Sequence, residues 1–362
     1  MIQLKDLCQK ASSNIAQKDL EGHEGQYPIY GASGLIGYVD FYKQENPYVA
    51  VVKDGAGIGR VMCLPEKSSV IGTMQYILPN EGVNVHYLAF AMEHMNLAKY
   101  FSGATIPHIY FKDYGKEKLL ERTEKEQKSI AEILSKMDSL ISLRKQQLAK
   151  LDELVKARFV EMFGDEQAFN KEPLSQNVEE MFIGPFGSSL KNESFVSKEN
   201  GYCMVYEQKH AIRKTMDVET RYIDKPKYEE LKRFSIHGGD IIVSCRGTIG
   251  ETYIVPLNAP LGIMHPSIMK IRVKDSIYNR VFFDFLLQEK LMQHEAQANG
   301  SGVKMAVTAS ALGKEEFIVP SIPFQNQFAA FAERVDQQKQ TIQQSLEKLE
   351  LMKKALMQEY FG

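Results

Sequence analysis

The chain has 362 residues, of which 44% are hydrophobic and 25% charged, so it can form two or three folded domains. Its formal net charge of −2 excludes a strongly basic protein, so any contact with nucleic acid must rest on local clusters of Lys and Arg. No apolar run approaches the ~20 residues of a membrane span. The N-terminus lacks a signal-peptide pattern and the cysteines are scattered, which predicts a cytoplasmic protein without membrane contact.

The first 120 residues predict a globular segment of short strands, turns and two helices. A helix is expected near residues 4–10, and residues 27–40 alternate β-prone pieces with glycine turns. Strands are expected at residues 48–52, 60–64 and 74–78. An amphipathic helix at residues 86–99 then leads into a polar loop that contains Ser102-Gly103.

The stretch KDGAGIGR, residues 53–60, contains a GxG pattern that dinucleotide-binding loops share. Such a loop needs G-x-G-x-x-G at the start of a helix, whereas a strand follows these glycines. The sequence therefore favours a plain hairpin turn over a phosphate-binding loop.

Residues 126–164 predict one long helix. There is no Pro or Gly from residue 126 to residue 163, and Lys, Glu, Gln, Leu and Ala dominate. Apolar side chains recur at alternating spacings of three and four, which is typical of a coiled-coil seam.

Residues 165–320 predict a second globule with the same order of features. A Gly/Ser/Pro turn region lies at residues 182–191, and the Gly-rich turn Arg246–Gly250 follows a buried strand. An amphipathic helix is expected at residues 279–297, before a second Ser-Gly loop. Strands are expected at residues 202–206, 239–244, 252–255 and 267–273, with a short helix at 228–234.

Residues 324–362 repeat residues 126–164 without a gap. A shift of 198 carries Gln127 onto Gln325, Leu148 onto Leu346 and Gly164 onto Gly362. The predicted helix-pairing residues are Ile130, Leu134, Met137, Ile141, Leu148, Leu151 and Val155 in the first copy and Phe328, Val335, Ile342, Leu346, Leu349 and Leu356 in the second. Arg144, Arg158, Lys339 and Lys353 interrupt this seam. We expect the two helices to pair with each other, and the alternative is that each packs on its own globule.

No motif specifies an active site. The chain has no Walker phosphate loop, no H-E-x-x-H and no G-x-S-x-G, and its histidines lack metal-ligand spacing. The acidic pairs Glu179-Glu180 and Glu315-Glu316 are interpreted as solvated. Binding therefore remains as the role of the globules.

Basic and polar side chains on the predicted turns are suited to phosphates and base edges. In the first globule the candidates for DNA binding are Tyr30, Ser33, Lys53, Arg60, Thr105 and His108. In the second globule they are Ser189, Lys191, Lys209, His210, Arg246, Thr248, Ser301 and Lys304. The plain alternative for each is a solvated turn residue. Arg246 is the sharpest candidate, because an arginine can pair bidentately with a guanine edge.

Four features together resemble the specificity subunit of type I restriction–modification systems. They are YPIYGASGLIGYVD at residues 27–40, GPFGSSL at 184–190, GDIIVSCRGTIG at 239–250 and the repeated helices ending in MFG and YFG. The resemblance covers essentially the whole chain.

The resemblance implies an α+β fold with two target recognition domains, each mixed α/β with small twisted sheets. Two long antiparallel coiled-coil helices would join them with pseudo-twofold symmetry. The expected divisions are recognition domain 1 at residues 1–120, spacer helix 1 at 121–164, recognition domain 2 at 165–320 and spacer helix 2 at 321–362.

The resemblance also implies what the protein does. Each recognition domain would read half of a bipartite asymmetric target in double-stranded DNA, and the helices would dock two methyltransferase subunits, which restriction subunits join. The chain would be non-catalytic and without cofactor, since S-adenosylmethionine, ATP and Mg would bind to the partner subunits. Two rivals are a coiled-coil adaptor joining protein- or glycan-binding domains, and an enzyme with an unrecognised site.

Overall fold

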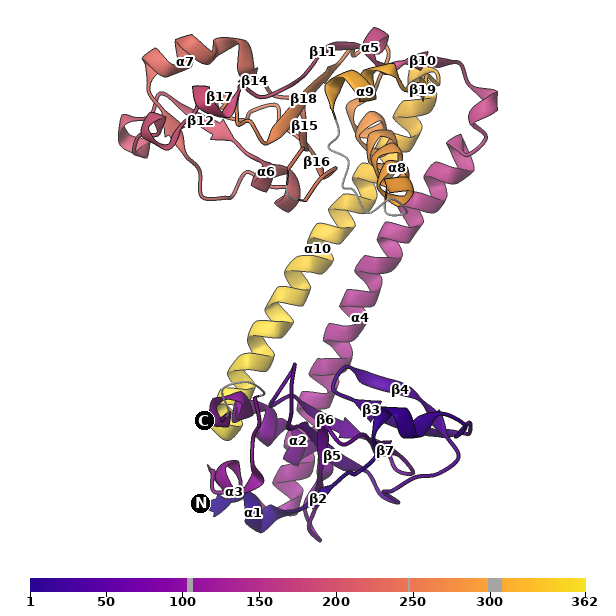
Figure 1. Ribbon diagram of the computed structural model, residues 1–362, viewed down its shortest axis with the longest axis vertical. Coiled ribbons are helices and arrows are strands. Elements are labelled where there is room, and N and C mark those ends of the chain that lie inside the picture. Colours follow the sequence, from indigo (N-terminus) through magenta and orange to yellow (C-terminus); the bar gives the residue numbers. More distant parts are fainter. Residues whose placement is uncertain (103–106, 247, 299–307) are drawn as a thin grey trace. The chain divides into compact units, whose positions relative to one another are not determined.

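The computed structural model describes residues 1–102, 107–246, 248–298 and 308–362, without the side chains of residues 294–298. The chain forms two compact units (Figure 1). Unit 1 comprises Met1–Ala149 and Gln340–Gly362, and unit 2 comprises Lys150–Lys339. Each unit therefore holds one globule and a part of each long helix.

Unit 1 is built on a four-stranded antiparallel sheet and a smaller mixed sheet. The first has the order β2 (Cys8–Ser12), β8 (Met74–Pro79), β5 (Tyr48–Val52), β6 (Val61–Leu64). The second has the order β4 (Gly34–Val39), β3 (Tyr27–Gly31), β7 (Ser69–Val70), and a ribbon pairs β1 (Ile2–Gln3) with β9 (Lys118–Leu119). Alternate residues of β5 face two cores: Val49 and Val51 pack with α2, and Tyr48 packs toward the mixed sheet.

The helices of unit 1 are short except for the two long ones. They are α1 (Leu4–Leu7), α2 (Val85–His94) and α3 (Phe111–Tyr114), with single turns at Gln17–Leu20 and Leu97–Tyr100. The long helices are α4 (Glu124–Phe163) and α10 (Ile322–Phe361). The predicted helix at residues 4–10 is shorter than expected, because Cys8–Ser12 pairs with β8 as a strand.

Unit 2 repeats this plan, with the same strand order in its antiparallel sheet and one more strand in its mixed sheet. Its antiparallel sheet has the order β11 (Val178–Ile183), β18 (Ile268–Val273), β15 (Ile241–Ser244), β16 (Thr252–Ile254). Its mixed sheet has the order β13 (Tyr222–Ile223), β12 (Cys203–Tyr206), β17 (Gly262–Met264), β14 (Ser235–Ile236), and a ribbon pairs β10 (Lys171–Pro173) with β19 (Glu316–Ile318).

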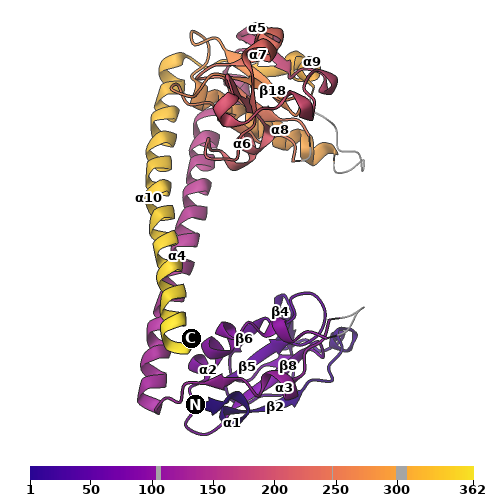
Figure 2. The ribbon, with the colours of Figure 1, turned by 90° about the vertical axis from the view of Figure 1, so that its left-hand side faces the viewer.

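In unit 2 helices cover both faces of the antiparallel sheet (Figures 1 and 2). Ile241 and Val243 pack against α8 (Arg280–Ala298), whereas Ile242 lies in the core shared with α6 (Gln208–Arg213). The other helices are α5 (Leu174–Asn177), α7 (Lys225–Leu231) and α9 (Ala309–Lys314), with single turns at Glu166–Ala168, Gly187–Ser189, Asn192–Ser194, Lys198–Asn200 and Lys232–Phe234.

The glycine stretch of unit 1 is a hairpin connection, as predicted. β5 and β6 pair antiparallel on either side of it. Gly55, Gly57 and Gly59 all have positive φ, which side chains other than glycine rarely adopt. A Cβ on Gly59 would also lie 2.5 Å from the Ala98 nitrogen, so a side chain there would collide with backbone.

Within unit 1, α4 and α10 lie antiparallel. The Lys145 ammonium pairs with Glu350 at 2.9 Å, and the Lys353 ammonium pairs with Asp138 at 2.7 Å. Residue numbers therefore increase in opposite directions along the two helices. The seam cation Lys353 therefore has an acidic partner on the other helix.

Within unit 2 the helices are again antiparallel neighbours. The Lys339 ammonium pairs with Asp152 at 2.5 Å. Phe328 of α10 is fully buried among aromatic rings of α4 and α8, including Phe159 at a centroid distance of 5.4 Å. The predicted seam residues of both copies are buried or half-buried. Both expected packings contribute, because residues near the ends of the long helices pack into a globule core, and ion pairs join the two helices within each unit.

A buried glutamine joins each globule to a long helix. In unit 1 the Gln127 Oε1 accepts the Asn84 N–H at 3.0 Å, and Asn84 caps α2. In unit 2 the Gln325 Oε1 accepts the Asn279 N–H at 2.8 Å, and the Asn279 side chain accepts from the first turn of α8. The two glutamines are equivalent in the sequence repeat, so the repeat extends to how each helix holds its globule.

The interpretation of the pair Glu179-Glu180 as solvated holds for Glu179 but only in part for Glu180. Glu180 lies in β11, and its carboxylate pairs with the Lys270 ammonium at 2.5 Å and with Arg272 at 3.1 Å. Lys270 is 1% exposed, so its charge needs a partner. Glu180 is thus part of a structural ion network, although its side chain is 38% exposed.

Candidate nucleic-acid interface

One rim of unit 1 joins three loops that lie far apart in the sequence. The Arg60 guanidinium donates to the Ala32 carbonyl at 2.6 Å, which ties the glycine hairpin to the β3–β4 turn. The Ile109 N–H donates to the Lys53 carbonyl at 3.0 Å, which ties the same hairpin to the segment after residue 106. The rim is therefore held by backbone-directed hydrogen bonds.

Most of the predicted residues of the first globule lie on this rim. Ser33 and Arg60 are exposed, and Tyr30, Lys53 and His108 are half-buried, while Thr105 lies outside the described residues. Burial and then the neighbouring Tyr38 raise the pKa of Tyr30, so its hydroxyl stays protonated and can donate a hydrogen bond.

An ion cluster that the sequence analysis missed lies at the centre of the rim. The Asp54 carboxylate accepts from the His108 Nδ1 and lies 3.7 Å from the Lys53 ammonium. The His108 ring lies 4.2 Å from the ring of Tyr110, and the Lys112 ammonium lies 5.1 Å above Tyr110. Tyr110 is 46% exposed, so this aromatic ring is open to a ligand.

Unit 2 carries a larger cluster around Glu207, at the end of β12. The buried Glu207 carboxylate pairs with Lys209 at 2.9 Å and with Arg221. The Arg221 guanidinium lies 4.0 Å from the centre of the Phe195 ring. Burial raises the pKa of Glu207, but hydrogen bonds from Arg221 and Lys209 outweigh it and leave the pKa below its usual value. The cluster therefore keeps its charges at neutral pH.

His265 connects this cluster with the Gly-rich turn. Its Nδ1 lies 2.7 Å from the Ser267 hydroxyl. Its pKa is lowered chiefly by burial and also by the positive charges of Arg221, Arg246 and Lys209, which offset the effect of Glu207. The backbone links this segment to both sides, because the His265 N–H donates to the Tyr206 carbonyl at 2.8 Å and the Ser267 carbonyl accepts the N–H of Cys245, the residue before Arg246, at 2.9 Å.

The other predicted residues of the second globule lie in different settings. Lys191, Arg246 and Thr248 are exposed, Ser189 and Lys209 are half-buried, and Ser301 and Lys304 lie outside the described residues. The cluster residues Glu207, Arg221 and His265 were not predicted, because nothing in the sequence brings these distant positions together.

The prediction that His210 contacts DNA is wrong. Its side chain is fully buried, and its Nδ1 accepts the Glu207 backbone N–H at 3.0 Å. Burial lowers its pKa, so the ring is neutral in the folded state. His210 supports the start of α6 and cannot reach a base edge.

Stability should fall as the pH is lowered from about 7.5 to about 5.5. His210 and His265 bind protons less readily in the folded protein than at their ordinary pKa of 6.5, so the unfolded chain takes up more protons on acidification. Each such group contributes a slope of at most about 1.4 kcal/mol per pH unit.

Urea unfolding at the two pH values should show a smaller loss of stability for His210→Gln than for the unaltered chain. His23→Gln is the matched control, because the His23 side chain is 46% exposed. Equal pH slopes for His210→Gln and the unaltered chain would contradict the assignment of His210 as a neutral core residue.

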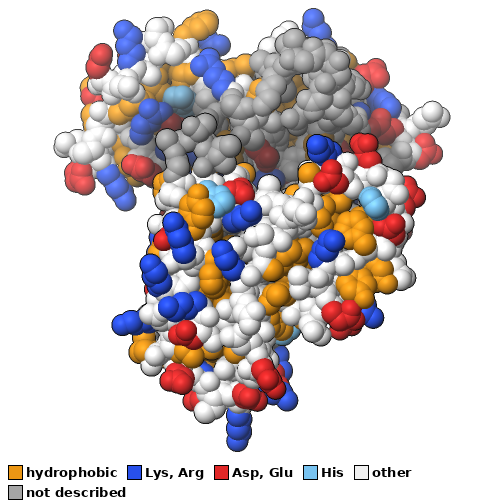
Figure 3. Space-filling model, turned by 60° about the horizontal axis from the view of Figure 1, so that its bottom comes forward, with side chains coloured by type: hydrophobic (Ala, Val, Ile, Leu, Met, Phe, Trp, Pro, Cys, Tyr) orange, Lys and Arg blue, Asp and Glu red, His pale blue; other side chains and the backbone are white. Residues whose placement is uncertain are grey.

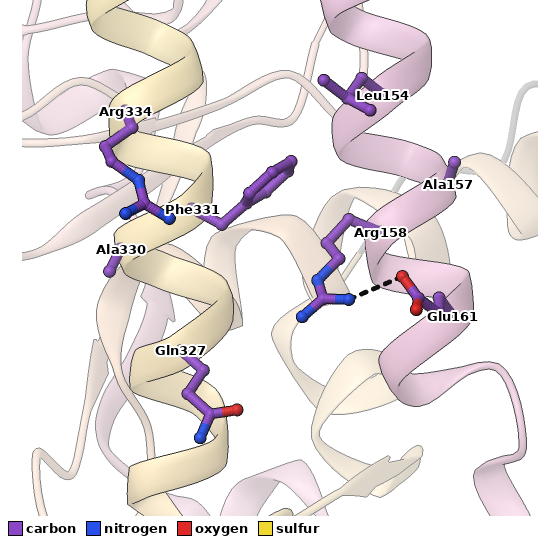
Figure 4. A pocket seen from close by; sticks show the side chains of 8 residues that line it. All are labelled: Leu154, Ala157, Arg158, Glu161, Gln327, Ala330, Phe331 and Arg334. Carbon is purple, nitrogen blue, oxygen red and sulfur yellow. Dashed lines mark hydrogen bonds and ion pairs between the residues drawn. The ribbon is translucent and has the colours of Figure 1, made fainter.

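A groove of about 580 Å³ lies between the two long helices within unit 2 (Figure 4). Leu154, Ala157, Arg158 and Glu161 line it from α4, and Gln327, Ala330, Phe331 and Arg334 line it from α10. The Arg158 guanidinium pairs with Glu161 at 2.7 Å along its own helix. The groove offers apolar surface together with guanidinium donors, which suits another protein rather than DNA.

On the face shown in Figure 3, side chains of both charges are present. Figure 3 shows Lys and Arg side chains interspersed with acidic and apolar ones, without one uninterrupted basic patch on the face in view. No helix within the described residues could cross a membrane. The same residues hold no group of three or more His, Cys, Asp or Glu side chains that could bind a metal ion.

The family model described as the type I restriction modification DNA specificity domain matches residues 1–153 and 182–351. No curated protein matches this chain.

Solved structures share the fold at low sequence identity. One is the S subunit of a type I restriction-modification system from M. genitalium, with 16% identity and a TM-score of 0.61, covering 100% of this chain and 95% of that one. Another comes from work on complex assembly and conformational transition of the type I R-M system, with 13% identity and a TM-score of 0.56, covering 99% and 96%.

Proposed function

We propose that this chain, which belongs to the type I restriction-modification DNA specificity family, reads a bipartite asymmetric DNA target, one half with each unit. The observation that carries the proposal is the duplicated strand order in units whose exposed loops bear different polar side chains. A shared scaffold positions the loops alike, and different side chains on them select different bases.

The loop residues of the two units are suited to two kinds of DNA contact, with bases and with phosphates. Arg246 can donate to both acceptors of a guanine edge in the major groove. Lys53, Arg60 and Lys191 can contact phosphates, which position the protein without reading sequence. With 44 Lys and Arg against 46 Asp and Glu, the chain has no excess of positive charge to attract phosphates, so partner subunits supply much of the affinity.

The chain acts as a non-catalytic subunit that docks two methyltransferase subunits along its helices, and restriction subunits join that core. S-adenosylmethionine, ATP and Mg bind to those partners. Support comes from apolar side chains that stay exposed at equivalent positions of the repeat: Leu154 at 46% and Met352 at 56%. Phe331 lines the groove of unit 2, and its repeat equivalent Ile133 is 38% exposed in unit 1.

A domain exchange tests the proposal. Replacing residues 165–320 by the second recognition domain of a relative should change one half of the sequence methylated by the complete system and leave the other half unchanged. The methylated sites can be read directly by sequencing genomic DNA from cells that express the system. A change in both halves, or in neither, would rule out the two-reader arrangement.

The docking surface is tested by charge substitution. Phe331→Glu should abolish retention of one of two methyltransferase copies, because a carboxylate in an apolar contact is costly to bury. The double variant with Ile133→Glu should retain neither copy. Native mass spectrometry of the co-purified complex counts the copies, and Glu153→Lys on the exposed surface of α4 is the control. Retention of both copies by the double variant would place docking elsewhere.

A further inference from the structure

The His108 ring in unit 1 is fixed from three directions. Its backbone N–H donates to the Ser102 carbonyl at 3.0 Å and its carbonyl accepts from Ser102 at 2.9 Å. Its Nδ1 contacts the Asp54 carboxylate, and its ring lies 4.2 Å from that of Tyr110. The orientation of the imidazole is therefore set before any ligand binds.

The contact with Asp54 determines which ring nitrogen carries the hydrogen. An ionised carboxylate can only accept a hydrogen bond, so the His108 Nδ1 must be the donor. In the neutral ring the Nε2 then carries a lone pair and acts as an acceptor. The His108 side chain is 27% exposed, and its Nε2 has no hydrogen-bond partner among the described residues.

Asp54 is poorly placed to contact DNA itself. Its carboxylate is occupied by His108 and lies 3.7 Å from the Lys53 ammonium, which compensates its negative charge. A carboxylate facing phosphates would otherwise repel them. Asp54 is instead placed to orient the His108 ring.

We infer, on the basis of the DNA-reading role proposed above, that His108 is a specificity-determining residue that accepts a hydrogen bond from the amino group of an adenine or a cytosine. In the major groove only adenine N6 and cytosine N4 present such donors, whereas guanine presents two acceptors there. Asp54 is a positioning residue, because it holds the ring in the accepting tautomer.

Two substitutions of His108 distinguish the roles of its two ring nitrogens. In His108→Gln the longer amide can place its oxygen near the former Nε2 position, whereas in His108→Asn the shorter amide reaches only the Nδ1 position. The complete system with His108→Gln should methylate its target at a rate within about twofold of that of the system with the unaltered chain. With His108→Asn the methylation rate should fall about tenfold, which corresponds to the loss of one hydrogen bond.

Asp54→Asn tests the positioning role. Its amide can donate to the His108 Nδ1, which lets the hydrogen move to Nε2 and turns the acceptor into a donor. The methylated sequence should then shift at one position from adenine or cytosine toward guanine or thymine. A uniform loss of methylation with unchanged base preference would show that Asp54 is merely structural.

A measurement on the unaltered complex covers the case in which a variant does not fold. Each adenine or cytosine of the half-site is replaced in turn by a nucleoside lacking the amino group, and binding is measured. At one position the replacement should weaken DNA binding about tenfold. The complex with His108→Asn should bind that modified DNA no more weakly than it binds the unmodified DNA. If no position responds, the inference is overturned. An exchange of residues 165–320 that leaves methylation unchanged would instead overturn the proposed function.

Discussion

Replacing Phe328 by alanine is expected to lower the free energy of unfolding of unit 2 by about 3–5 kcal/mol. Phe328 is fully buried, and its ring lies 5.4 Å from Phe159 and 5.3 Å from Phe285. The alanine variant loses the transfer free energy of the ring and leaves a cavity at the point where α10, α4 and α8 meet. Hydrogen exchange of the full chain measures the loss through the amides of α8.

Two controls accompany this substitution. Phe328→Leu keeps most of the buried volume and should cost much less than the alanine variant. Leu351→Ala removes an apolar side chain that is 68% exposed, so it should change stability by no more than about 0.5 kcal/mol. Unaltered protection of α8 in Phe328→Ala would mean that the aromatic cluster does not hold the helices to the globule.

Asp240→Ala is expected to destabilise unit 2 by about 3–5 kcal/mol. Asp240 is 1% exposed, and its carboxylate accepts from the Arg272 guanidinium at 2.7 and 2.8 Å. It also accepts the His237 backbone N–H at 2.8 Å. Removing it leaves a half-buried guanidinium and a backbone donor without their main acceptor. Urea unfolding measures the change in stability.

A double-mutant cycle with Arg272→Met isolates the pair, since the double variant removes both charges and should recover part of the loss. The control is Asp275→Ala, because the Asp275 carboxylate pairs with Arg280 at 2.6 Å but is 67% exposed. That pair should contribute about 0–1 kcal/mol. Equal losses for Asp240→Ala and Asp275→Ala would contradict the importance of burial.

Local patterns predicted the parts of the fold that depend on local physics. The heptad spacing predicted the long helices, because apolar periodicity and the absence of Pro and Gly within the repeated segments act along the chain itself. The hairpin at residues 53–60 followed from its glycines and from the strands beside it. The strand β11 was missed, because the sequence VEEMFI contains two acids in a row. Those acids are tolerated since Glu180 meets the buried Lys270 of the neighbouring strand.

The candidate sites were predictable only as loops. The sequence indicated that Lys53 and His108 lie on turns, but the hydrogen bonds that bring their segments together depend on tertiary structure. The contact between Asp54 and His108 was not predicted, because an aspartate in a turn is usually solvated. The burial of His210 was missed for a related reason: α6 turns its side chain into the core, and a polar stretch of sequence does not show which of its side chains is buried.

The glutamine that joins each globule to its long helix has a consequence for exchange of parts. Gln127 receives a backbone N–H and donates to the Arg122 carbonyl, and Gln325 likewise donates to the carbonyls of Ile277 and Pro320. All of these bonds engage main-chain groups, so in both units they do not depend on which side chains the globule carries. The attachment of a globule to its long helix therefore does not depend on the side chains with which that globule binds its target. A replacement globule would therefore need only a backbone N–H at the start of the helix equivalent to α2 or α8 to make the same bond.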